Sequence, residues 1–136
     1  MSRSGYSGDG SQWDFIKWRG AVNSAIRGKR GQKFLKEMLA YLDAMPVKAL
    51  AKESLMSDSG EYCALGVVGS NRGLDMVDID PEDIDYVACA LNIAGALAKE
   101  IVFENDENGP YYRETTSERW ERMRRWVVSN INEVKK

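Results

Sequence analysis

The reactive side chains of this 136-residue sequence allow only a narrow range of chemistry. The sequence contains no histidine, which excludes histidine-ligated metal sites, Ser/His and Cys/His nucleophile pairs and histidine general bases. Its two cysteines, Cys63 and Cys89, cannot form a thiolate zinc site alone. Both lie among Ala, Leu and Val, so we expect two unreactive core thiols. We therefore predict a protein that is not an enzyme and has no catalytic residue, metal or cofactor.

Carboxylates are the most concentrated functional groups in the sequence. Between residues 75 and 85 the acidic residues are Asp75, Asp78, Asp80, Glu82, Asp83 and Asp85. Paired carboxylates can act as general acid and base, but no second functional group accompanies these, so catalysis is the weakest interpretation. Asp80, Glu82 and Asp83 also suit the start of a helix. Because acids interleaved with apolar residues imitate the spaced charges of a nucleic acid, we predict that this stretch binds a basic groove on a partner protein.

Basic residues form a second concentration near the N-terminus. Seven lie between Lys17 and Lys36, and glycines flank the Lys29-Arg30 pair, which predicts a tight basic turn. Such a turn could hold a phosphate with backbone N–H groups and cations, although the sequence lacks the Gly-Lys-Ser/Thr of a nucleotide-binding loop. The candidate contacts to a partner or phosphate are Arg19, Arg27, Lys29, Arg30 and Lys33. Alternatively, these residues form a solvated face that pairs with the acidic middle of the chain.

Three weaker patterns also bear on function. Residues 104–109 resemble the first half of a calcium-binding loop, but the twelfth position is Thr115 where a glutamate is needed, which favours a polar turn. Residues 82–103 resemble a helix-turn-helix with a corner at residues 92–93, yet the second helix starts with Ala and Gly, so the corner indicates packing. Trp126 lies beside the apolar stripe of the last helix, and we predict that it is an exposed interface anchor.

The elements that position these residues are predicted to be helices. Apolar spacing and end signals indicate an all-α, compact, single-domain bundle of about six helices over residues 11–136, preceded by a mobile N-terminal arm over residues 1–10. We expect helices over about 11–27, 32–44, 62–72, 80–91, 94–104 and 117–134. Residues 47–56 fit a short helix or a strand, and their composition favours a helix. Asp80-Pro81 is expected to start one helix, and a Thr115–Glu118 capping box to start the last.

Charge is distributed unevenly along the chain, although the net charge is only −2. Residues 1–52 carry ten basic and four acidic side chains, whereas residues 57–109 carry twelve acidic and two basic ones. Each block is a candidate contact surface, unless the two neutralise each other within the fold. No apolar run is long enough to cross a bilayer and no apolar signal segment begins the sequence, so we expect a cytoplasmic protein without membrane contact.

Four segments resemble a group of small proteins encoded by tailed bacteriophages and prophages. They are WDFIKWRGAVNSAIRGKRGQKFLKEML, EYCALGVVG, LAKEIVFENDENG and ERWERMRRWVV, and the resemblance covers roughly residues 5–130. EYCALGVVG is also similar to a CCLGV segment of other small phage proteins, with Ala64 in place of the second cysteine. The resemblance implies a host-cytoplasmic setting during infection and supplies no catalytic residue.

We therefore expect a phage-encoded binding protein that inhibits a host protein or an anti-phage defence complex, such as a CRISPR or restriction system. It would act by steric block, with the acidic stretch facing a nucleic-acid channel of its target. One alternative is a nucleic-acid-binding accessory protein that uses the basic turn. Another is a sponge that sequesters a signalling nucleotide with the same turn at a homodimer interface.

Overall fold

The computed structural model describes residues 12–107 and 113–132. Within them the chain forms an all-α single domain with no strand. The helices are α1 (Gln12–Arg27), α2 (Lys29–Ala44), α3 (Ala64–Asn71), α4 (Ile84–Leu91), α5 (Gly95–Asp106) and α6 (Thr116–Asn130), with a short 3₁₀ helix, η1 (Met76–Asp78). The predicted fold class is confirmed. The predicted arm over residues 1–10 lies outside the described residues.

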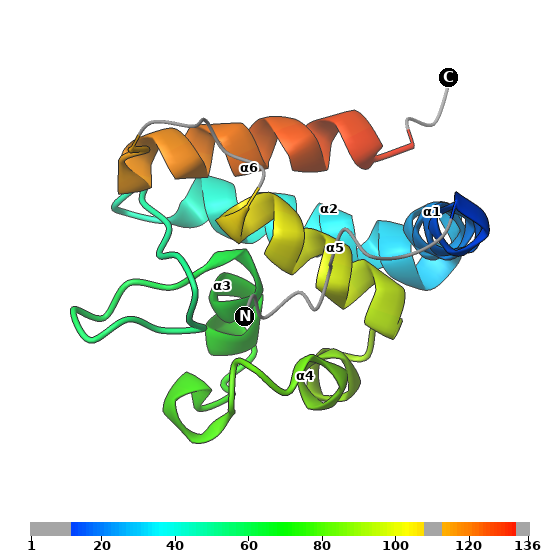
Figure 1. Ribbon diagram of the computed structural model, residues 1–136. Helices are drawn as coiled ribbons and strands as arrows, with labels where there is room; N and C mark the ends of the chain where they lie inside the picture. Colours follow the sequence, from blue (N-terminus) through cyan, green and yellow to red (C-terminus); the bar gives the residue numbers. More distant parts are fainter. Residues whose placement is uncertain (1–11, 108–112, 133–136) are drawn as a thin grey trace.

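Helices α2 and α5 form the middle of the molecule (Figure 1). Helix α2 packs against α1, α3 and α6, and α5 packs against α1, α3, α4 and α6. In the view of Figure 1, α6 lies above α2 and α5, whereas α3 and α4 lie below them. A single apolar core joins these layers, with Phe34, Leu35, Met38 and Leu42 of α2 buried at its centre. Their i, i+1, i+4, i+8 spacing is the apolar stripe on which the helix was predicted.

The break between α1 and α2 is shorter than predicted. Only Gly28 separates the helices, so Lys29, Arg30 and Gly31 form the first turn of α2 and no separate basic turn exists. Gly31 is buried against the end of α1, and a Cβ added there would lie 1.9 Å from the carbonyl oxygen of Ala25. Its role is therefore the close approach of two helices, which a side chain would prevent.

Residues 47–56 form an irregular, partly buried segment and not a helix. Ala49, Leu50 and Ala51 are all buried, a run of consecutive apolar contacts that one face of a surface helix cannot make. The backbone instead bonds to distant partners: Leu50 N–H donates to Thr116 O, and Ala51 N–H donates to Tyr62 O. The predicted helix is wrong here because these tertiary hydrogen bonds outweigh a weak local preference.

Residues 55–62 double back as a loop closed by an isolated antiparallel bridge between Met56 and Tyr62. Gly60 has a φ of +88° and donates its N–H to Ser57 O, which closes a turn over residues 57–60. The chain then enters α3, where the Sγ of Cys63 accepts a hydrogen bond from Gly66 N–H. This loop lies beside the segment that carries the acidic residues.

Helix α4 begins at Ile84, and its N-cap is Asp83, three residues later than the predicted start at Asp80. Asp80 and Pro81 belong to a turn in which Asp80 Oδ1 accepts from Glu82 N–H, and Asp83 is the N-cap, accepting from Tyr86 N–H. An Asp side chain can close a turn as readily as it can cap a helix, and here the turn prevails. The predicted corner follows, with Asn92 in the left-handed conformation and the α4–α5 axes at 111°. The predicted Thr115–Glu118 capping box of α6 is confirmed.

Candidate functional site

The six predicted acidic residues all have exposed side chains, on η1, on the turn over residues 79–83 and on the first turn of α4. Together with Val77 and Tyr86 we call them the acidic surface; its carboxylates are Asp75, Asp78, Asp80, Glu82, Asp83 and Asp85. Three of these carboxylates accept backbone hydrogen bonds. Asp75 accepts from Val77 N–H, and Asp80 and Asp83 accept within the turn and at the helix cap. Each of the three therefore holds the local backbone while remaining exposed to solvent.

Ion pairs elsewhere in the described residues neutralise some of the charge asymmetry, but none involves the acidic surface. Arg19 pairs with Glu100, Arg72 with Glu37 and Arg124 with Asp43, each across two elements. Hydrogen bonds from Arg72 and Arg124 hold the pKa values of Glu37 and Asp43 below their ordinary range. Basic side chains therefore meet acids of α2 and α5, and the part of the chain that the structure describes has no such pair at residues 75–85.

Two large apolar residues are exposed within or directly after this stretch of the sequence. Val77 is 68% exposed and Tyr86 is 57% exposed, and they are two of the five large apolar residues most exposed in the described chain. The sequence analysis singled out neither residue, because local spacing does not show whether an apolar residue beside acidic ones is buried or exposed. Exposed apolar side chains of this kind can be buried when a partner protein binds.

Two predictions about single residues are wrong. Trp126, the predicted exposed anchor, is half-buried and packs against the core from α6. Cys89, predicted as a core thiol, is exposed on α4, whereas Cys63 is buried as predicted. In both cases the sequence spacing lies at the edge of the apolar stripe, where a small rotation of the helix decides between burial and exposure.

The predicted basic residues do not form one site. Arg27, Lys29, Arg30 and Lys33 are exposed around the α1–α2 junction, and Arg30 Nη1 donates to Asn92 Oδ1 at 3.5 Å. Arg19 lies two turns earlier on α1, about 12 Å away along a helix axis. It is half-buried, its guanidinium lies over the Trp18 ring at 4.6 Å, and it pairs with Glu100. Arg19 is therefore a structural residue that links α1 to α5.

A groove lies between the 55–62 loop and the segment that carries the acidic surface. Its cavity volume is about 320 Å³, and we call it the loop groove. Most of its lining is apolar, and its only charged lining residue is Asp58; the lining residues are Ser54, Leu55, Met56, Ser57, Asp58, Met76, Val77, Ile79 and Pro81. Along the acidic segment, Val77, Ile79 and Pro81 line the groove while the exposed Asp78 and Asp80 alternate with them.

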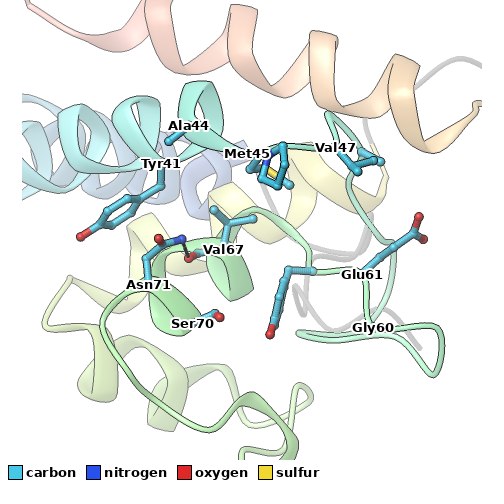
Figure 2. A pocket seen from close by; sticks show the side chains of 12 residues that line it. Tyr41, Ala44, Met45, Val47, Gly60, Glu61, Val67, Ser70 and Asn71 are labelled. Carbon is cyan, nitrogen blue, oxygen red and sulfur yellow. Dashed lines mark hydrogen bonds between the residues drawn. The ribbon is translucent and has the colours of Figure 1, made fainter.

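A second hollow lies on the other side of the same loop, with a cavity volume of about 290 Å³. Figure 2 shows Tyr41 at one end and Glu61 at the other, with Val67 and Asn71 of α3 between them. Asn71 Nδ2 already donates to Val67 O. Burial raises the Tyr41 pKa, and its hydrogen bond to Glu37 raises it further. The lining contains no cysteine or lysine nucleophile, and its one carboxylate, Glu61, lies at the opposite end from Tyr41, so the hollow suits the packing of an apolar group better than acid–base or nucleophilic chemistry.

The described residues contain no group of three or more Cys, Asp or Glu side chains arranged to hold a metal ion. None of the helices among the described residues has both the length and the hydropathy needed to cross a membrane. Helices α4 and α5 meet the length and hydropathy requirement only when taken together, and this pair is bent by 111°. In the predicted calcium-like segment, Glu104 and Asp106 belong to α5. Comparisons with protein-family models, with curated proteins and with solved structures gave no significant match.

Proposed function

We propose that this chain is a phage-encoded binding protein, without catalytic activity, that blocks a nucleic-acid-binding protein of the host or of a defence complex. The acidic surface makes the contact. The observation that carries the proposal is that six carboxylates are exposed within eleven residues and that none of them pairs with a described lysine or arginine.

The arrangement suits a basic partner for two physical reasons. A concentration of unpaired negative charge accelerates association with a positive surface and disfavours acidic partners. Val77 and Tyr86 add apolar area that can be buried at the centre of such a contact. The charged rim then supplies orientation, and the apolar residues supply slow dissociation.

The test compares two triple variants that remove equal charge. D78N/D80N/D85N neutralises the acidic surface, and the asparagine at position 80 can still accept the hydrogen bond from Glu82 N–H. E53Q/E61Q/E121Q removes three acids elsewhere. Each protein is used to capture partners from bacterial lysate, and the captured protein is then assayed for nucleic-acid binding.

We expect the wild type and the control variant to capture the same protein and to prevent it from binding nucleic acid. The acidic-surface variant should capture much less, with the difference shrinking at high salt. If D78N/D80N/D85N captures and inhibits as well as the wild type, the acidic surface is not the contact and the proposal is wrong.

A further inference from the structure

We infer that the loop groove receives the side chain of an arginine from a basic polypeptide segment, with the aliphatic stem in the groove and the guanidinium at Asp58. This inference rests on the proposed function and specifies its partner: a basic polypeptide that inserts side chains, and not only a positive surface at a distance. The groove and the acidic surface share Val77, so one bound segment can contact both.

The lining of the groove matches such a side chain in polarity. Six of the nine lining residues are apolar, and they come from both walls, Leu55 and Met56 on the loop and Met76, Val77, Ile79 and Pro81 opposite. Arginine and lysine bury their methylene stems against apolar surface while the charged end stays at a polar rim. An uncharged aliphatic ligand would pack against the apolar walls but would leave the Asp58 carboxylate without a binding partner.

Charge selects the cationic occupant. Asp58 is exposed at the tip of the 57–60 turn, no lysine or arginine lines the groove, and no described residue forms an ion pair with Asp58. The exposed Asp78 and Asp80 alternate with the groove-lining residues of the opposite wall. A nucleic acid, which is the other extended polymer considered for this chain, would be repelled by the same carboxylates.

Arginine is favoured over lysine because its guanidinium can donate two parallel hydrogen bonds to one carboxylate. Asp58 presents such a carboxylate at the groove, and its side chain has no described hydrogen-bond partner. The same fork geometry holds Arg72 on Glu37 in this protein, with donor–acceptor distances of 2.9 and 2.6 Å.

The first experiment measures the affinity of the wild-type chain for three peptides, each of which carries the same fluorescent label. The first is (Gly-Arg)₃. In the second, each arginine is replaced by 2-amino-3-guanidinopropionic acid, which keeps the guanidinium and shortens the stem by two methylenes. The third is (Gly-Leu)₃. Loss of two buried methylenes should weaken binding about tenfold, and we expect the leucine peptide to bind more weakly than the arginine peptide. Equal affinity of the two guanidinium peptides, absence of binding, or tighter binding of the leucine peptide would overturn the inference.

The second experiment locates the contact with amide chemical shifts and matched variants. Titration with (Gly-Arg)₃ should shift the amides of residues 54–58 and 76–79. Ser54→Phe fills the groove without changing charge, and Val128→Phe adds the same ring type to an exposed position on α6. D58N removes the groove carboxylate, and E121Q removes an exposed one elsewhere. We expect S54F and D58N to weaken binding of the arginine peptide and V128F and E121Q to leave it unchanged. If S54F and D58N both have native spectra and bind the peptide with wild-type affinity, the peptide does not bind in the loop groove and the inference is wrong.

The proposed function and the groove inference can each be contradicted independently of the other. If D78N/D80N/D85N loses the captured host protein while S54F and D58N keep it, the acidic surface stands and the groove inference is wrong. If the triple variant keeps the captured protein, the proposed function is wrong whatever the peptides do.

Discussion

At the scale of single residues, two buried glycines set how closely the elements approach. A Cβ on Gly31 would lie 1.9 Å from Ala25 O, and one on Gly66 would lie 2.1 Å from Leu55 O. In each case the obstructing atom is backbone, so no side-chain rotation can relieve the overlap. The first glycine seats α2 against α1, and the second seats α3 against the 47–56 segment that forms one wall of the loop groove.

Alanine substitutions at two helical glycines should therefore have opposite effects. G31A forces the α1–α2 junction apart, and we expect it to lower the free energy of unfolding by about 3 kcal/mol. G20A has nothing within 4 Å of the added Cβ, and should raise the free energy of unfolding by about 0.5 to 1 kcal/mol because alanine favours the helix. Urea denaturation of both variants measures the difference, and equal stabilities would contradict the tight junction.

At the scale of elements, a buried carboxylate fixes the start of α6. Glu114 is paired with Arg122 at 2.7 Å and with Arg119 at 3.3 Å, and all three side chains are largely buried. Arg119 Nη1 donates to Leu50 O, and Arg122 donates to the last carbonyls of α5 at Glu104 and Asn105. One glutamate thus holds two arginines that connect α6 to α5 and to the partly buried 47–56 segment.

Stability should fall in acid because of these pairs. The hydrogen bond from Arg122 lowers the pKa of Glu114 from its ordinary value of 4.5, and arginine partners lower those of Glu37 and Asp43. The unfolded chain then binds more protons than the folded one, so the stabilisation is present above about pH 4.5 and decreases as the pH falls through the lowered values.

E114Q should remove part of this acid sensitivity. We expect its melting temperature at pH 7 to be lower than that of the wild type, because two buried arginines lose their anion at a cost of about 3 kcal/mol. Its melting temperature should change less than the wild type's between pH 5 and pH 3. E121Q, which alters an exposed glutamate outside the pairs, serves as control. A wild-type acid slope in E114Q would contradict the role assigned to Glu114.

At the scale of the whole molecule, the charge asymmetry is cancelled in some places and left open in others. Pairs such as Arg19–Glu100 and Arg124–Asp43 use basic residues of the chain ends to bind acids of α5 and α2. The acidic surface and the exposed residues at the α1–α2 junction take no part in described ion pairs. The molecule therefore has two surfaces of opposite sign, of which the acidic one also carries exposed apolar groups.

A nucleic-acid-binding assay distinguishes between the functions proposed for these two surfaces. Because the net charge is −2 and the acidic surface repels phosphates, we expect no binding of duplex DNA or RNA at 0.15 M salt in an electrophoretic mobility assay. Binding that falls steeply with salt and is lost in K29A/R30A would favour the alternative function based on the α1–α2 junction, with K48A/K52A as a control of equal charge on exposed residues.

Local patterns predicted much of the fold but less of the site. The stripes of α2 and α5, the corner at Asn92 and the capping box at Thr115 were all predicted, because each depends on neighbours within one or two turns. The six carboxylates are exposed, as expected for charged side chains, because burying an unpaired charge is costly. The burial of Trp126, the exposure of Tyr86 and the loop groove were not predicted, since each depends on residues that are distant in the sequence.

The sequence by itself determined an all-α chain without histidine chemistry, with its acids and bases in separate blocks. Periodicity and composition determine such properties because they act over a few residues. Only the tertiary structure decided which charges are paired, where helix α4 begins, and that residues 47–56 form a wall of a groove. Those outcomes depend on a competition between local conformational preference and contacts formed across the whole fold. In residues 47–56, for example, burial of Leu50 and Leu55 in the core outweighs the local preference for a helix.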